Sequence, residues 1–295
     1  MEIEKEKERI IKFLREKLNE ERKDGYVLGV SGGIDSAVVS YLLKDAVGRE
    51  RIFALIMPEM DSEPASVEDA LLVVENLGIP YKVFSLTKAL WILGVYKSVP
   101  LFFFLFRPLK RRVVKYLYSE YSKILGKPVF FAQKEKLNIK LHWFYEGIAY
   151  HRIKHRLRMA LLYFFAERKN YLVVGCNNLT ESLIGYYVRY GDDASDIEPI
   201  SHLYKTEIRE LAKILGIPRR IIEKPPSPDL LPGISDEFSL GLDYITLDRI
   251  LKSFEEGKEP SQLKDFDEKL IKLVYDQYLW VKRESKKPLR LVREE

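Results

Sequence analysis

Four short runs of apolar residues alternate along the chain with segments that mix apolar and charged positions. The runs are typical of strands buried on both faces, and they cover residues 26–30, 51–57, 81–86 and 171–175. The mixed segments are typical of helices, and they cover residues 2–23, 37–43, 66–77, 151–168 and 205–215. Strands that alternate with helices through short loops predict a parallel sheet with helices on both faces, which is a doubly wound α/β fold.

The alternation stops between residues 88 and 150, where no βα repeat can be recognised. This segment contains a strongly apolar stretch at 99–106, followed by a basic run at 107–112. An inserted helical and aromatic segment or a dimer contact explains it best, and a groove for a large substrate or a patch for membrane or nucleic acid are alternatives. We predict a single domain over residues 1–295, with an insertion at about 88–150 and C-terminal helices at 244–295.

The composition narrows the class of protein without identifying it. Apolar residues make up 46% of the 295, and no run approaches the roughly 18 apolar residues that a membrane span needs. The single cysteine, Cys176, favours a reducing compartment such as the cytoplasm. Charged residues reach 32% and are rich in Lys, Glu and Arg, which is typical of a thermophile's surface. The net charge of +5 does not by itself argue for nucleic acid.

The most informative stretch lies between the first strand and its helix, at residues 31–36, with the sequence SGGIDS. A glycine pair lets the backbone approach an anion, and a helix N-terminus supplies unpaired N–H groups and a partial positive charge. The two serines add hydroxyl donors. Asp35 would repel a bare phosphate, which suggests a bridging cation. The stretch predicts a phosphate site, although it matches neither GxxxxGK[ST] nor GxGxxG.

This loop resembles the SGGxDS pyrophosphate loop of the N-type ATP pyrophosphatases, which cleave ATP between the α- and β-phosphates to adenylate a substrate. More specific motifs follow in order: GDDASDIEPI at 191–200, LYKT at 203–206, KPPSPDL at 224–230 and DEFSLG at 236–241. Together they resemble the ammonia-dependent NAD synthetases over residues 25–90 and 150–252. The resemblance implies an adenine nucleotide α-hydrolase-like, Rossmann-like form of the predicted fold.

The resemblance also implies a two-step reaction. The nicotinate carboxylate of deamido-NAD attacks the α-phosphorus of ATP and forms an acyl adenylate and pyrophosphate. Ammonia then displaces AMP and leaves the amide, which is NAD. A free carboxylate is a poor acyl donor, so adenylation supplies the leaving group for the second step. ATP is therefore expected as a substrate and Mg²⁺ as the metal ion.

Roles for individual residues follow from the same resemblance. The residues expected to hold pyrophosphate or ATP are Ser31, Gly32, Gly33, Asp35, Ser36, Met57, Lys205 and Ser227. Asp35 and Glu181 would bind Mg²⁺, and Lys205 would neutralise the phosphate leaving group, so Asp35 and Lys205 are the catalytic candidates. The residues expected to contact deamido-NAD are Arg156, Asp192 and Asp196. A merely structural role is the alternative for each.

Some positions depart from the family's pattern. The helix that usually begins Asn-Ile-Lys-Ala-Arg has Arg152 and His155 in place of the asparagine and the alanine. Cys176 stands in a loop that is usually Gly-Thr-Gly-Asn, and Asp193 stands where glycine is usual. All of these fall on the acceptor side or the adenine rim. ATP cleavage is therefore a firmer prediction than deamido-NAD, and another small acid or an RNA base is the alternative acceptor.

Three further expectations concern partners and reactive side chains. The resemblance implies an acceptor site built across a two-fold interface, so we predict a homodimer that uses free ammonia. Cys176 is predicted to be a packing residue, because no His or Asp is spaced to form a dyad with it. His151 and His155 lie four apart on one helix face, where a basic anion-binding face is favoured over a metal pair.

Overall fold

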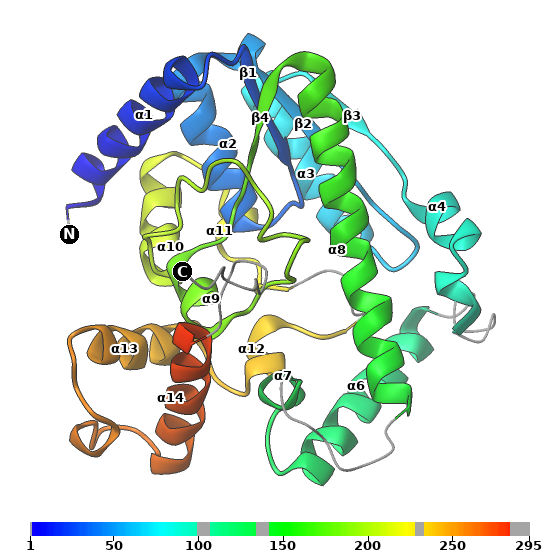
Figure 1. Cartoon of the computed structure of the whole chain (residues 1–295), viewed down its shortest axis with the longest axis vertical. Coiled ribbons are helices and arrows are strands. Elements are labelled where there is room, and N and C mark those ends of the chain that lie inside the picture. Colours follow the sequence, from blue (N-terminus) through cyan, green and yellow to red (C-terminus); the bar gives the residue numbers. More distant parts are fainter. Residues whose placement is uncertain (1, 99–106, 134–141, 228–232, 284–295) are drawn as a thin grey trace, which may run out of the picture.

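The computed structural model describes residues 2–98, 107–133, 142–227 and 233–283 (Figure 1). Its centre is a four-stranded parallel sheet in the order β3-β2-β1-β4. The strands are β1 Gly25–Gly29, β2 Ile52–Ile56, β3 Tyr81–Val83 and β4 Tyr171–Val174. All four fall within or next to the apolar runs of the sequence, and the predicted parallel α/β fold is confirmed.

Alternate residues of the central strand face two different layers of helices. Tyr26 and Leu28 pack with helices on one face of the sheet, and Val27 packs on the other. The first layer contains α1 Ile3–Glu20, α2 Ile34–Val47, α3 Pro64–Leu77, α10 Lys205–Ile214 and α11 Arg219–Ile222. The second layer contains α4 Thr87–Ile92 and α8 His142–Lys169. Because both faces are covered, each position of the strand is apolar.

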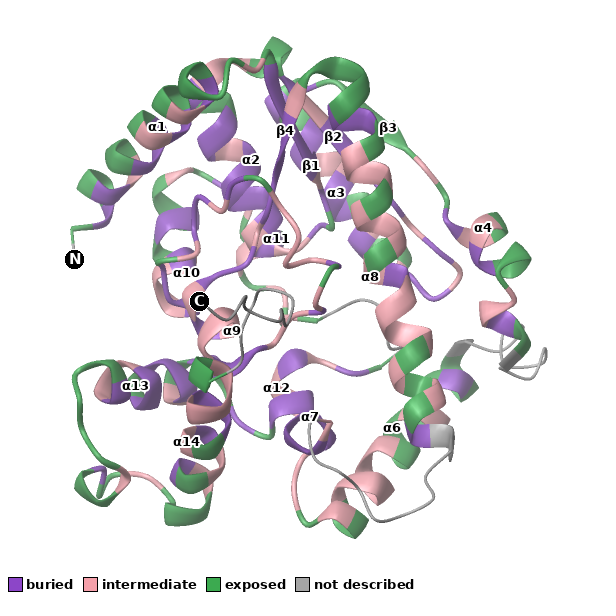
Figure 2. Cartoon of the chain, viewed as in Figure 1, coloured by how far each residue is buried: buried purple, intermediate pink, exposed green. Residues whose placement is uncertain are grey.

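A further group of helices lies below the sheet in Figure 1. It comprises α6 Arg107–Leu125, α7 Val129–Ala132, α9 Leu179–Ile184, α12 Asp236–Leu240, α13 Tyr244–Glu255 and α14 Glu268–Arg283. Phe130, Leu247 and Val274 belong to its apolar core. Figure 2 shows α1, α13 and α14 with buried positions on one side and exposed positions on the other. Short 3-10 helices occur at Arg49–Arg51, Val95–Ser98 and Pro260–Gln262.

The segment from 88 to 150 is largely helical where the structure describes it. Helix α8 begins at His142 rather than at residue 151, so the end of the expected insertion is the first part of a long helix. The apolar stretch 99–106 lies outside the described residues. None of the helices in the described ranges combines the length and the apolar character that crossing a membrane requires.

Helix α3 starts two residues before the range of 66–77 expected from the sequence. It begins at Pro64, whose fixed φ suits the first helical position. Within this helix, the Asp69 carboxylate accepts a hydrogen bond from Nζ of Lys224 at 2.8 Å. This contact ties α3 to the segment that follows α11.

A buried cluster of charges fixes α8 and the neighbouring helices to the loop after β2. The side chain of Lys154 is 0% exposed, and its Nζ donates to Glu59 at 3.0 Å and to Asp61 at 2.9 Å. The hydroxyl of Tyr150 donates to Asp61 at 2.5 Å, and that of Tyr96 donates to Glu59 at 2.6 Å. Burying these carboxylates is tolerable only because each one has a cation and a hydroxyl as partners.

We predict that Lys154→Met strongly destabilises the fold. The change leaves Glu59 and Asp61 buried without their shared ammonium partner, which costs about 3–5 kcal/mol of the free energy of unfolding. Urea denaturation followed by circular dichroism measures this loss. Arg156→Met is the matched control, because Arg156 is an exposed residue of the same helix and should change stability by about 0.5 kcal/mol or less. Equal effects of both changes would contradict the assigned role of the cluster.

Candidate active site

The carboxyl ends of β1 and β4 lie next to each other where the order of the strands reverses. In an open parallel sheet, such a switch point leaves a crevice in which ligands bind. Residues 31–36 span the loop after β1 and the first turn of α2, and residues 175–178 form the loop after β4. The predicted phosphate loop therefore stands where the fold itself provides a binding crevice.

The local geometry of the loop after β1 explains its glycine pair. Gly32 has a φ of 77°, and a Cβ at this position would overlap the carbonyl oxygen of Ser66. The hydroxyl oxygens of Ser31 and Ser36 lie 3.1 Å apart, and that of Ser31 accepts from the N–H of Gly33 at 3.2 Å. The two hydroxyl groups therefore lie together beside the N-terminus of α2, and a helix N-terminus favours an anion.

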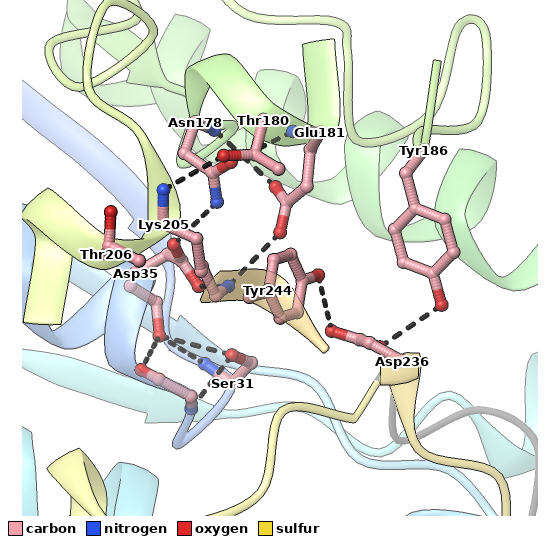
Figure 3. Close-up of polar contacts among 12 residues, drawn as sticks. Ser31, Asp35, Asn178, Thr180, Glu181, Tyr186, Lys205, Thr206, Asp236 and Tyr244 are labelled. Atoms are coloured by element: carbon pink, nitrogen blue, oxygen red, sulfur yellow. Dashed lines mark hydrogen bonds and ion pairs between the residues drawn. The ribbon is translucent and has the colours of Figure 1, made fainter. Parts of the chain in front are cut away.

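Lys205, the first residue of α10, places its ammonium group between two carboxylates (Figure 3). Its Nζ lies 2.6 Å from Oδ2 of Asp35 and 3.2 Å from Oε1 of Glu181. The side-chain amide of Asn178 donates to Oδ1 of Asp35 at 2.9 Å. Asp35 belongs to α2 and Glu181 to α9, so three helices that are distant in the sequence meet at the crevice.

The charges of this cluster are shielded from solvent, and only 3% of the Lys205 side chain is exposed. Burial favours the neutral amine, but the charges of Asp35 and Glu181 outweigh burial and raise the pKa of Lys205, so the ammonium ion persists. Burial also raises the pKa of Glu181 against the opposing charge of Lys205, and Asp35 and Asp236 add to the rise. Carboxylates outnumber ammonium groups here, so a further cation would relieve their repulsion.

Asp236 is a member of this site whose role the sequence did not indicate. Its carboxylate accepts hydrogen bonds from the hydroxyls of Tyr186, at 3.1 Å, and Tyr244, at 3.0 Å (Figure 3). The ring of Tyr244 lies 5.1 Å from Nζ of Lys205, which is a cation–π distance. Asp236 stood inside one of the motifs, but a motif does not show which side chains turn inward. Nothing in the sequence indicated that Tyr186 belongs to the site.

A second buried carboxylate, that of Asp248, fixes the first turn of α10. The hydroxyl of Thr180 donates to Asp248 at 2.5 Å and accepts from the backbone N–H of Lys205 at 2.9 Å. The other oxygen of Asp248 accepts from the backbone N–H of Thr206 at 2.8 Å. Two otherwise unpaired N–H groups of the helix end are thereby satisfied, and the Lys205 side chain starts from a fixed backbone.

A cavity of about 670 Å³ extends from this cluster to α6 and α8. The predicted site residues that line it are Ser31, Gly33, Asp35, Ser36, Met57, Glu181, Asp192, Lys205 and Ser227. Part of its wall comes from the inserted segment, with Val113, Leu117 and Tyr121 of α6. The predicted phosphate loop and α6 thus border one continuous space, whose size is usual for a small-molecule site.

Three of the predicted site residues do not line this cavity. Gly32 packs against the backbone of α3 behind the loop. Arg156 is exposed, and its Nε donates to the carbonyl oxygen of Arg189 at 3.3 Å. Asp196 accepts from the backbone N–H of Val173 at 2.8 Å, where it fixes the edge of β4.

Other residues of α8 face the cavity in place of Arg156. They are His151, Arg152, His155, Arg158 and Leu162. Four of them recur at helical spacing, three or four residues apart, so they share one face of the helix. This periodicity could have identified them in the sequence, whereas the motif pointed to the exposed neighbour.

Cys176 also lines the cavity, but it does not have the environment of a nucleophile. Burial raises the pKa of its thiol, and the charges of Asp35, Glu181 and Glu198 raise it further, so the thiol stays protonated. Among the described residues, no group of three or more His, Cys, Asp or Glu side chains is arranged to hold a metal ion.

The fold and the site define a class of protein, the parallel α/β proteins that bind nucleotide phosphates at the sheet's switch point. A sequence model described as NAD synthase matches residues 6–97 and 109–287. The chain belongs to this family. It is 53% identical to the NH₃-dependent NAD⁺ synthetase of Coprothermobacter proteolyticus over 98% of each chain. It is 46% identical to that of Thermotoga maritima, over 91% of this chain and 92% of the relative.

Solved structures with the same fold agree with this assignment. The NH₃-dependent NAD synthetase from Campylobacter jejuni, solved in complex with nitrate, superposes with a TM-score of 0.69 and 28% identity over the whole of both chains. The NMN synthetase from Francisella tularensis superposes with a TM-score of 0.73 and 25% identity, again over both whole chains.

Proposed function

We propose that the protein is an ATP-dependent amide ligase that adenylates the nicotinate carboxylate of deamido-NAD and transfers ammonia to it. The products are NAD, AMP and pyrophosphate. The observation that carries the proposal is the buried ammonium group of Lys205, held by Asp35 and Glu181 beside the anion-binding loop. Membership of the NAD synthase family and the identity of 53% to an NH₃-dependent NAD⁺ synthetase support the same reaction, and they do not favour an RNA base as acceptor.

The first step requires a site that holds the leaving pyrophosphate while the carboxylate attacks the α-phosphorus. We assign this binding to Ser31, Gly32, Gly33 and Ser36, whose hydroxyl and N–H groups lie at the start of α2. Lys205 neutralises the charge that grows on the leaving group. Its ammonium group is held in place before ATP binds, so little reorganisation is needed when the charge develops.

The side chains at this site fit Mg²⁺. Asp35 and Glu181 both contact the ammonium group of Lys205, so the two carboxylates lie close enough together to act on one small cation. Mg²⁺ prefers one or two carboxylates together with phosphate oxygens and water, so a third protein ligand is not required. We propose that Asp35 and Glu181 hold the ion when ATP is bound. The ion supplies positive charge that offsets the phosphates.

The remaining assignments concern the nucleotide and the acceptor. Met57, Ser227 and Asp192 all line the cavity; the first two are proposed contacts of ATP, and Asp192 is a proposed contact of deamido-NAD. Arg156 and Asp196 stay proposed contacts of deamido-NAD. Both lie outside the cavity lining of one chain, so the acceptor would have to extend past that lining to reach them.

We also propose that the chain forms one domain with its insertion, acts in the cytoplasm and assembles as a homodimer. Its lone cysteine supports a reducing compartment. Exposed apolar residues of the inserted segment support the dimer, and they include Leu109, Tyr116, Leu117, Ile124 and Tyr145. Apolar side chains gathered on one segment are typical of a surface that a second copy covers.

The reaction is tested by following AMP, pyrophosphate and NAD with ATP, deamido-NAD, Mg²⁺ and ammonium. We expect the three products in equal amounts, because one ATP is cleaved for each amide formed. The carboxylic acid form of nicotinamide mononucleotide serves as the competing acceptor, since one structural neighbour is an NMN synthetase. If AMP formed with the mononucleotide acid and not with deamido-NAD, the assigned acceptor would be wrong and the assigned reaction class would be right.

We expect Asp35→Asn to lower turnover by about 100-fold or more while the protein remains folded. The amide keeps the shape of the side chain but removes one negative charge from the proposed Mg²⁺ site. Glu181→Gln should behave alike, and the double variant should be little worse, because both groups act through one ion. Asp45→Asn, an exposed residue at the other end of α2, is the control. Near-normal turnover of folded Asp35→Asn would contradict the metal assignment.

Analytical ultracentrifugation tests the dimer. At micromolar concentration we expect a single species with the mass of two chains, because the apolar residues of α6 are then covered. Tyr116→Glu should shift this species towards the monomer, since it buries a charge at the contact and Tyr116 is not among the residues that line the cavity. Sedimentation of the wild type as a monomer would contradict the proposed assembly.

A further inference from the structure

Away from the phosphate loop, one pair of titratable residues in the cavity has the arrangement of a proton-transfer dyad. Nδ1 of His155, on α8, lies 3.2 Å from Oδ1 of Asp192. The same carboxylate oxygen accepts from the backbone N–H of Val188 at 2.7 Å, which fixes its position. The other ring nitrogen, Nε2, is buried and has no hydrogen-bond partner among the described residues. Both side chains line the cavity.

The carboxylate decides which ring nitrogen carries the proton. An ionised carboxylate can only accept, so Nδ1 is the donor and Nε2 is the nitrogen left to exchange a proton with a ligand. Burial opposes the ionisation of Asp192, yet the neighbouring His155 and the backbone N–H groups lower the pKa of this carboxyl group. Asp192 therefore stays ionised and holds the imidazole in the tautomer that a general base needs.

The packing around the pair holds the ring in one orientation. A Cβ on Gly191 would lie 2.8 Å from Cβ of His155, so only glycine lets this loop approach α8 so closely. The rings of His151 and His155 meet edge to face, with their centroids 4.8 Å apart. Burial lowers the pKa of His151 well below its ordinary value, so this neighbouring ring is neutral.

The pair is connected to the phosphate site through two successive residues. The side-chain amide of Asn178 donates to Asp35, and that of Asn177 donates to the carbonyl oxygen of Asp192 at 3.0 Å. Asn177 and Asn178 are consecutive, and consecutive Cα atoms are about 3.8 Å apart. One short loop therefore contacts both the phosphate site and the His155–Asp192 pair. In the acyl adenylate, the acyl carbon is joined to the α-phosphorus through one oxygen. A base for the second step must therefore lie close to the phosphate site and in the same cavity.

We propose that His155 is the general base of the ammonia-transfer step and that Asp192 is its positioning residue. This inference rests on the proposed function. The nitrogen lone pair of ammonia attacks the carbonyl carbon, the C–N bond forms, and the C–O bond to AMP breaks with its electron pair leaving on the phosphate. One N–H proton passes to Nε2 of His155, which later releases it to solvent. The step yields the amide, AMP and one proton, and it consumes no other reactant.

The test measures the two half-reactions separately in His155→Ala. Adenylation is followed as the exchange of labelled pyrophosphate into ATP, with deamido-NAD present and ammonium absent. Transfer is followed as NAD formation in a single turnover at saturating ammonium. We expect exchange within about twofold of wild type and transfer slower by about 100-fold or more, because only the second step needs the base.

Hydroxylamine distinguishes a missing base from a distorted site. Hydroxylamine is uncharged at neutral pH. After it attacks the carbonyl carbon, its nitrogen loses a proton to water far more readily than the nitrogen of attached ammonia does. Transfer to hydroxylamine should therefore be close to wild type in His155→Ala. His155→Gln, which keeps a donor for Asp192 without a basic nitrogen, should show the same split. Asp192→Asn should slow transfer to ammonia far more than transfer to hydroxylamine, because Asp192 acts through the base.

His202→Ala is the matched control, because His202 pairs with Glu6 at 2.6 Å and is not among the residues that line the cavity. Both half-reactions should be unchanged in it. Wild-type transfer in His155→Ala would overturn the base assignment alone. A parallel loss of exchange and transfer would overturn it too, because that pattern indicates substrate binding. Absence of exchange in the wild-type protein would overturn the proposed function itself.

Discussion

The site depends on one buried ammonium group, that of Lys205. Such a group stays charged only where carboxylates surround it, and Asp35 and Glu181 provide them from two other helices. The carboxylates also depend on the ammonium group, because they would repel each other in the absence of Lys205. The starts of α2, α9 and α10 are therefore brought together by charge as well as by apolar packing. The hydrogen bonds of Asp248 then fix the helix end that carries the lysine.

A second buried ammonium group, that of Lys154, fixes the opposite wall of the cavity. It binds Glu59 and Asp61 in the loop after β2, so α8 cannot rotate without breaking these contacts. His155 is the next residue of the same helix, and Arg158 donates to the carbonyl oxygen of Met57 at 3.0 Å. The direction in which His155 enters the cavity is therefore set by ionic contacts on a neighbouring face of α8. The site thus rests on two ion clusters, one on each side of the cavity.

The sheet and the phosphate loop could be predicted from the sequence because their constraints are local. Strands buried on both faces must be continuously apolar, and only glycine fits the backbone at Gly32. Tertiary partners were not predictable, and Asp236 shows the reason. Its partners Tyr186 and Tyr244 precede and follow it by 50 and 8 residues, and they meet only when α9, α12 and α13 pack together. The start of α8 was missed because its first turns belong to a segment without a single apolar face.

The exclusion of water from the cavity explains both the inserted segment and the His155–Asp192 pair. Val113, Leu117 and Tyr121 place apolar groups on the wall of the cavity, and an acyl adenylate lasts longer where water is excluded. Excluding water also removes the solvent that would otherwise accept the proton lost by the attacking nitrogen. A site that protects its intermediate in this way needs an internal base, and an imidazole whose second nitrogen is held by a carboxylate can serve as one.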